Sequence, residues 1–151
     1  RQLTEDGAYE VPEELKEKIQ SLFWAGCCGD DETKQTIGRV WQEHHYLCDT
    51  HTAVAWNVAQ QYKAANPAHA PVVVLSTASP YKFPAAVLGG LGEKAEGDEF
   101  AVMEQLERLT RIPAPKNLRG LRERPVRHTT VLDREEMLPF VLEKAQEKKW
   151  F

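Results

Sequence analysis

The residues between Ser76 and Lys82 carry the clearest chemistry in this sequence. They read Ser-Thr-Ala-Ser-Pro-Tyr-Lys, which places three hydroxyls, a phenol and one ammonium group close together. The apolar run Val72–Leu75 before them is typical of a buried strand, and Ser79 followed by Pro80 is typical of a helix start. Free amides at a helix start attract anions, whereas a lysine in the first turn is not otherwise favoured there. The segment is a candidate phosphate or carboxylate site, although a serine cap beside a solvated lysine is the interpretation that these residues alone favour.

Ser79 and Lys82 also match the Ser-x-x-Lys nucleophile motif of penicillin-recognising enzymes. The companion motifs Ser-Asp-Asn and Lys-Thr-Gly do not occur in the sequence, and Pro80 stands in the intervening turn. We therefore do not expect a serine nucleophile at this position.

A second group of potential ligands precedes this segment. Its members are Glu43, His44, His45, Cys48, Asp49 and His51. They form neither Cys-x-x-Cys nor His-Glu-x-x-His, the spacings typical of zinc sites, and they cross a helix–loop–helix junction. Asp49 as a helix cap and two histidines at a helix end explain the group without a metal. We expect no metal site, with a zinc domain as the less favoured alternative.

Helices must position most of these residues. Apolar side chains recur at helical spacing in six segments: after Pro12, after Asp30 or Asp31, from about 51 to 64, from Pro80 to about 89, from about 99 to 110, and from Asp133 onward. Asp49 or Thr50 can cap the third of these helices, and Asp133 with Glu136 forms a capping box for the last.

Two short β-branched runs, at 72–75 and 126–132, predict strands. The first lacks polar alternation, which is typical of a strand covered on both faces of a parallel sheet. Residues 111–125, with three prolines, predict a loop. The expected class is α/β, a helix-rich three-layer arrangement with a small, mainly parallel sheet.

Composition limits the classes of function. The chain has 151 residues, of which 42% are hydrophobic and 28% charged, so it can bury a core. A net charge of -4 disfavours general binding to nucleic acid or to an anionic membrane, and no apolar run is long enough for a membrane span. Three cysteines, two of them adjacent, make no disulfide framework and favour a cytoplasmic setting.

Two segments together resemble the threonine synthase family. Asp49-Thr50-His51-Thr52-Ala53-Val54 is similar to the family's Asp-Pro-His-Thr-Ala-Val, with Thr50 in place of the proline. Residues 75–84, Leu-Ser-Thr-Ala-Ser-Pro-Tyr-Lys-Phe-Pro, resemble the family's Ser-Thr-Ala-[Ser/His]-Pro-x-Lys-Phe segment. Order and separation agree as well, and the resemblance extends from about Leu22 to the end of the chain.

The resemblance implies an enzyme that converts O-phosphohomoserine and water into threonine and phosphate, with pyridoxal phosphate on a fold-type-II scaffold. By that resemblance Thr77 would hydrogen-bond the cofactor's pyridine nitrogen, with Ser76 as a second cofactor-binding residue. Lys82 would contact the substrate phosphate or orient the loop. Four further residues would form the wall of the site: Ser79, His51, Thr52 and Asp49.

The departures from the family are equally informative. The family's Phe-Lys-Asp, whose lysine forms the Schiff base with the cofactor, is absent from the sequence, as is its glycine-rich phosphate loop. We therefore expect residues 1–151 to be a single C-terminal segment of a larger synthase, with the remainder of that polypeptide as its partner and no activity in isolation. The alternative is a non-catalytic α/β domain that binds a small phosphorylated ligand or a protein partner.

Overall fold

The computed structural model describes residues 2–68 and 70–147, and its regular elements are helical. In chain order they are α1 (Gln2–Asp6), α2 (Glu13–Gln20), α3 (Asp30–His44), α4 (Thr50–Ala65), the 3-10 turn η1 (Pro80–Lys82), α5 (Pro84–Gly90), α6 (Glu99–Thr110), α7 (Lys116–Arg119), the 3-10 turn η2 (Arg134–Glu136) and α8 (Met137–Glu147). The chain divides into two compact units, Arg1–Arg119 and Gly120–Phe151.

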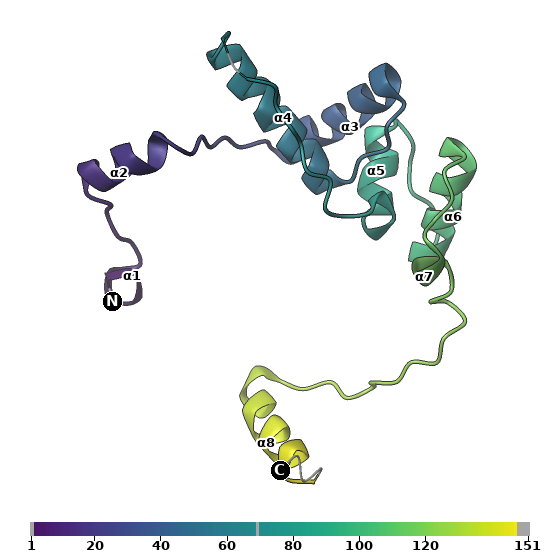
Figure 1. Ribbon diagram of the computed structural model, residues 1–151. Helices are drawn as coiled ribbons and strands as arrows, with labels where there is room; N and C mark the ends of the chain where they lie inside the picture. The colour runs from purple at the N-terminus through teal and green to yellow at the C-terminus, as the bar shows by residue number, and fades with distance from the viewer. Residues whose placement is uncertain (1, 69, 148–151) are drawn as a thin grey trace. The chain divides into compact units, whose positions relative to one another are not determined.

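Four helices of the first unit share a hydrophobic core. α3 packs against both α4 and α5, and α5 packs in turn against α6 (Figure 1). Three of them bury residues of the apolar stripes that their periodicity predicts: Ile37 and Val40 come from α3, Val87 and Leu88 from α5, and Leu106 from α6. The stripe predicted for α4 is at most half-buried, and Ala53 is the apolar residue that this helix buries. In α3, α5 and α6 a neighbouring helix covers the apolar face, so the amphipathic pattern leads to burial there.

Local capping explains where these helices begin and end. Asp49 caps α4, as predicted. The predicted helix at 99–110 is confirmed as α6, which ends where Arg111 adopts a left-handed backbone conformation (φ 61°). At the start of α3, however, Gly29 takes the cap position and Asp30 is already the first helical residue. The helix predicted from Pro80 is divided into η1 and α5.

α3 and α5 approach each other backbone to backbone. A Cβ atom on Gly38 would lie 2.5 Å from the carbonyl oxygen of Gly90, and one on Gly90 would lie 2.8 Å from the carbonyl oxygen of Lys34. Only hydrogen fits at these two positions, so the glycines set the separation of the two helices.

The expected α/β class, with its three layers and small parallel sheet, is wrong for the residues that the structure describes. Both predicted strands, 72–75 and 126–132, are irregular. Val73 is 82% exposed and Val131 is 92% exposed, so neither run has a covering layer. β-branched composition favours an extended backbone, but a strand forms only when a second strand pairs with its amides and carbonyls.

The outer elements confirm local predictions. The helix predicted after Pro12 is present as α2, and the capping box of η2 forms as predicted, with the Asp133 amide donating to Glu136 Oε2 at 3.0 Å. The stretch predicted as a loop at 111–125 contains the short helix α7. Among the helices described, none combines the length and the apolar character needed to cross a bilayer.

Candidate functional site

The candidate site begins at the first turn of α4. Asp49 is fully buried, and its Oδ1 accepts hydrogen bonds from the amides of His51 (2.9 Å) and Thr52 (3.3 Å). These bonds satisfy two of the amides that a helix start leaves without intrahelical partners. The other carboxylate oxygen, Oδ2, accepts a short hydrogen bond from the Thr52 hydroxyl. Asp49, the predicted helix cap, therefore also binds the side chain of Thr52.

Thr52, which lies in the first family motif (residues 49–54), also contacts the second family motif, residues 75–84. Thr52 Oγ1 lies 3.2 Å from Ser76 Oγ, and Tyr46 Oη lies 2.9 Å from the same serine oxygen. We call Tyr46, Ser76, Thr52 and Asp49 the hydroxyl chain. It joins residues up to 30 positions apart in the sequence. The two segments that carry the family resemblance thus meet through direct hydrogen bonds.

The electrostatics keep Asp49 ionised. Burial by itself would raise its pKa, but the Thr52 hydroxyl and the amides of Thr52 and His51 all donate to the carboxylate. Hydrogen bonds to the charged form stabilise it. Their combined effect outweighs burial, and the pKa of Asp49 lies below its ordinary value.

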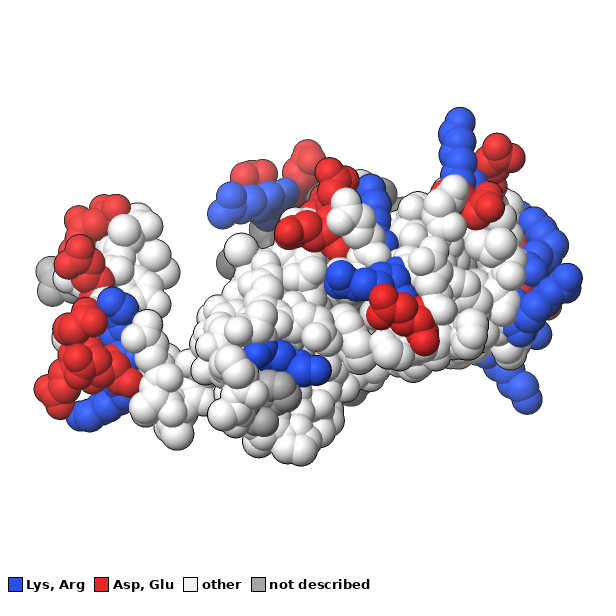
Figure 2. Space-filling model, turned by 90° about the horizontal axis from the view of Figure 1, so that it is seen from above, with Lys and Arg blue, Asp and Glu red and all other residues white. Residues whose placement is uncertain are grey.

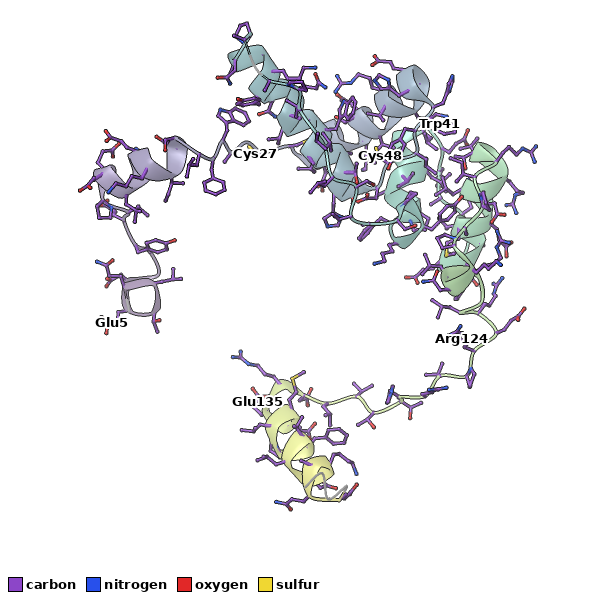
Figure 3. All side chains as sticks on the ribbon, viewed as in Figure 1. Glu5, Cys27, Trp41, Cys48, Arg124 and Glu135 are labelled. Carbon is purple, nitrogen blue, oxygen red and sulfur yellow. The ribbon has the colours of Figure 1, made fainter. Side chains whose placement is uncertain are left out.

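A cavity of about 280 Å³ adjoins the hydroxyl chain. Besides Tyr46, Thr52 and Ser76 it is lined by Val40, Cys48, Trp56 and Val74. Cys48 lies buried between α3 and α4 (Figure 3), where burial raises the pKa of its thiol to about 11. The thiol is therefore protonated at neutral pH and is not a nucleophile there. The lining suits small apolar groups flanked by hydroxyls.

The other predicted residues of the second motif lie outside the hydroxyl chain. Thr77 is exposed, and its hydroxyl makes no hydrogen bond within the described residues. Ser79 caps η1, with its Oγ accepting from the Tyr81 amide at 3.3 Å. Lys82 is exposed at the last position of η1. The structure thus places two of the motif's hydroxyls in structural contacts and leaves Thr77 and Lys82 facing solvent.

His51 projects from the other side of the α4 start. Its ring lies 5.1 Å from the ring of Phe83, and its Nδ1 is 3.4 Å from Asp49 Oδ1. Together with Lys34 and Thr50 it lines an open groove of about 840 Å³ between α3, α4 and α5. His51 therefore belongs to a different surface from the cavity beside Ser76.

The histidine-rich group does not converge. His44 packs its ring against Trp56 at 5.3 Å and His45 packs against Trp41 at 6.3 Å. In the part of the chain that the structure describes, no three His, Cys, Asp or Glu side chains come together as a metal site would require. The zinc alternative finds no geometric support there.

Tyr46 belongs to the hydroxyl chain but is not among the residues that the sequence predicts for the site. It follows the end of α3 in an irregular connection, where no periodicity or capping rule applies. The local signal was its position three residues before Asp49, which alone does not indicate a contact with Ser76. Figure 2 shows acidic and basic side chains in separate groups, and large parts of the face in view carry neither.

With this geometry established, comparison with known proteins decides the family. The sequence profile of the family described as "Threonine synthase, C-terminal" matches residues 52–141, well over half of the chain. This chain belongs to that family. The match begins inside the first motif and includes the whole of the second, so the resemblance drawn from those motifs is confirmed.

Individual relatives agree with the profile. "Threonine synthase-like 2" from Homo sapiens is 34% identical over 101 residues, which covers 66% of this chain and 21% of the relative. "Threonine synthase" from Pseudomonas aeruginosa is 32% identical over 88 residues, covering 58% of this chain and 18% of the relative. The matched region therefore spans about a fifth of the length of these curated relatives.

Proposed function

We propose that this chain supplies the C-terminal wall of the cofactor and substrate site of a threonine synthase. The reaction would be conversion of O-phosphohomoserine and water into threonine and phosphate, catalysed by a carbon–oxygen lyase acting on phosphates. The observation that carries the proposal is the contact between Thr52 and Ser76, because it brings both family motifs to one place. Family membership supports the same conclusion.

The donor set present fits one edge of pyridoxal phosphate. Thr77 offers an exposed hydroxyl without a protein partner among the described residues, which can donate to the pyridine nitrogen. When bound, the cofactor supplies an electron sink for the substrate's carbon chemistry. The exposed ammonium group of Lys82 is free to pair with a substrate phosphate, and Ser79 and His51 would shape the surrounding wall.

The remaining parts of the site are assigned to other sequence. No lysine of this chain stands in a Phe-Lys-Asp setting, and the matched region is about a fifth of the relatives' length. The rest of the polypeptide would contribute the cofactor-binding lysine and the phosphate loop. The 151-residue chain by itself is therefore proposed to be inactive.

A chimera tests this assignment. The matching region of the Pseudomonas aeruginosa threonine synthase is replaced by this chain, and phosphate release from O-phosphohomoserine is measured with pyridoxal phosphate present. We expect turnover by the chimera and none by the isolated chain. Thr77→Ala should lower turnover about tenfold or more, the effect of losing one hydrogen bond to the reacting system.

Two controls make the result specific. Thr77→Ser keeps the hydroxyl and Thr129→Ala removes an exposed hydroxyl in the second unit; both should stay near the parent chimera. Full activity in the Thr77→Ala chimera would refute the role of Thr77. Sustained turnover by the isolated chain would refute the proposal that the site is incomplete.

We also propose a cytoplasmic location for this protein. All three cysteines are free thiols, and Cys27 is exposed. Free exposed thiols persist in reducing compartments, which supports the proposal. Detection of the native protein in a cytosolic fraction tests it.

A further inference from the structure

The hydroxyl chain has a direction that follows from counting its hydrogens. A threonine hydroxyl has one hydrogen, and that of Thr52 is used in the short bond to Asp49, whose ionised carboxylate can only accept. The 3.2 Å contact between Thr52 and Ser76 is therefore supplied by the hydrogen of Ser76. Tyr46, 2.9 Å from the same serine oxygen, must then be a donor. Hydrogens run from Tyr46 to Ser76, from Ser76 to Thr52, and from Thr52 to Asp49.

This direction separates the roles of two neighbouring hydroxyls. The single hydrogen of Ser76 is committed to Thr52, so this serine has none to donate to a ligand. Thr77, the next residue, is exposed and has no partner among the described residues. Ser76 therefore cannot share the ligand-binding role of Thr77 without breaking a bond to buried Thr52.

The hydrogen bonds of Ser76 matter because the segment around it, residues 72–78, makes few other polar contacts with the folded unit. Within the described residues, the backbone from Val72 to Ala78 makes no hydrogen bond. Its contacts with the folded unit include the Ser76 hydroxyl, bonded to Thr52, and the side chain of Val74, which lines the adjoining cavity. At the other end of the hydroxyl chain, Asp49 and Thr52 are buried at the start of the 16-residue helix α4. A buried helix start is thus connected to a segment whose backbone makes no hydrogen bonds within the described residues.

We propose that Ser76 is a positioning residue, held by Tyr46 and Thr52 on the Asp49 anchor, so that Thr77 alone of the two hydroxyls is presented to a ligand. This inference rests on the proposed function for the identity of the ligand and deepens it. The hydroxyl chain itself is a property of the protein without cofactor or substrate. It can be tested on this chain directly.

The test is backbone order on the picosecond-to-nanosecond timescale, measured by ¹⁵N relaxation NMR on the 151-residue chain. In the parent protein we expect order parameters at Ser76 and Thr77 near the ~0.85 of rigid backbone, and below ~0.6 in Thr52→Val. Thr52→Ser restores the hydroxyl and should restore the order. Thr36→Val is the matched control, since Thr36 is equally buried but hydrogen-bonds Asn57 instead.

Tyr46→Phe provides an independent test that does not disturb the buried helix start. Tyr46 is about half exposed, so its ring can remain in place while the donor to Ser76 is lost. A drop in order at residues 76 and 77 in both Thr52→Val and Tyr46→Phe supports the proposal. Unchanged order in both, or an equal drop in Thr36→Val, overturns it. A different result is a chimera that shows no turnover while the order parameters of the 151-residue chain respond as expected. That result would refute the proposed function and not the positioning role.

Discussion

Helices α6 (Glu99–Thr110) and α8 (Met137–Glu147) have similar lengths and similar amphipathic character but different surroundings. Each has about three turns and carries large apolar residues at helical spacing. α6 buries Val102 and Leu106 against the core of the first unit. In α8, Leu138 and Leu142 are more than half exposed, and no residue of that helix is buried within the part that the structure describes.

The difference shows what an amphipathic pattern can establish. The pattern forms the helix and defines its apolar face; Asp98 caps the start of α6, and the capped turn η2 leads directly into α8. Burial requires a partner surface, which α5 provides for α6. Of the four predictions below, the first and the last test whether the apolar residues of the two helices differ in energy as they differ in burial, and the other two test packing and capping in the first unit.

The largest effect is expected at Leu106, which is completely buried. Leu106→Ala should lower the free energy of unfolding by about 2–5 kcal/mol, from lost apolar transfer and a residual cavity. Urea unfolding followed by circular dichroism measures the change. Leu109→Ala on the exposed face of the same helix is the control, and an equal loss there would contradict the assigned core.

A smaller loss is expected at Gly38, where α3 meets α5. Alanine has the better helix propensity by about 1 kcal/mol, but its Cβ would lie 2.5 Å from the backbone oxygen of Gly90. Overpacking against backbone should outweigh propensity, for a loss of about 1–3 kcal/mol in unfolding free energy. Gly89→Ala, whose nearest neighbour is the flexible Lys34 side chain at 3.8 Å, should instead be neutral or stabilising.

Asp49→Ala should cost about 1 kcal/mol of unfolding free energy at pH 6, the usual value of a lost helix cap. The carboxylate's pKa is lower in the folded than in the unfolded chain, so its contribution is present above the ordinary value of 3.8 and is lost as the pH falls through the folded pKa. The difference in unfolding free energy between the parent chain and Asp49→Ala should therefore become smaller in urea titrations at successively lower pH. A difference that stays constant with pH would show that the charge of Asp49 does not contribute.

The smallest effect is expected in α8. Leu142 is 55% exposed, and Leu142→Ala should change the stability of the chain by no more than about 0.5 kcal/mol. The same urea experiment measures it beside Leu106→Ala. A loss of 2 kcal/mol or more at Leu142 would mean that this face is covered in solution, and the contrast between the two helices would fail.

Local rules predicted much of the helical structure. The Asp49 cap, the Asp133–Glu136 capping box and the helix at 99–110 depend on contacts within one or two turns, so neighbouring residues suffice to specify them. The two predicted strands failed because strand pairing is non-local. A valine-rich run carries no information about whether a partner is present.

The candidate site divides in the same way. The sequence by itself determined the family, through two motifs in order, and it determined that Asp49 begins a helix. Only the tertiary structure decided that Thr52 reaches Ser76, that Tyr46 joins them, and that Thr77 is left exposed. Residue type states how many hydrogens a hydroxyl can donate; which acceptor receives them depends on packing between segments that are distant in the chain.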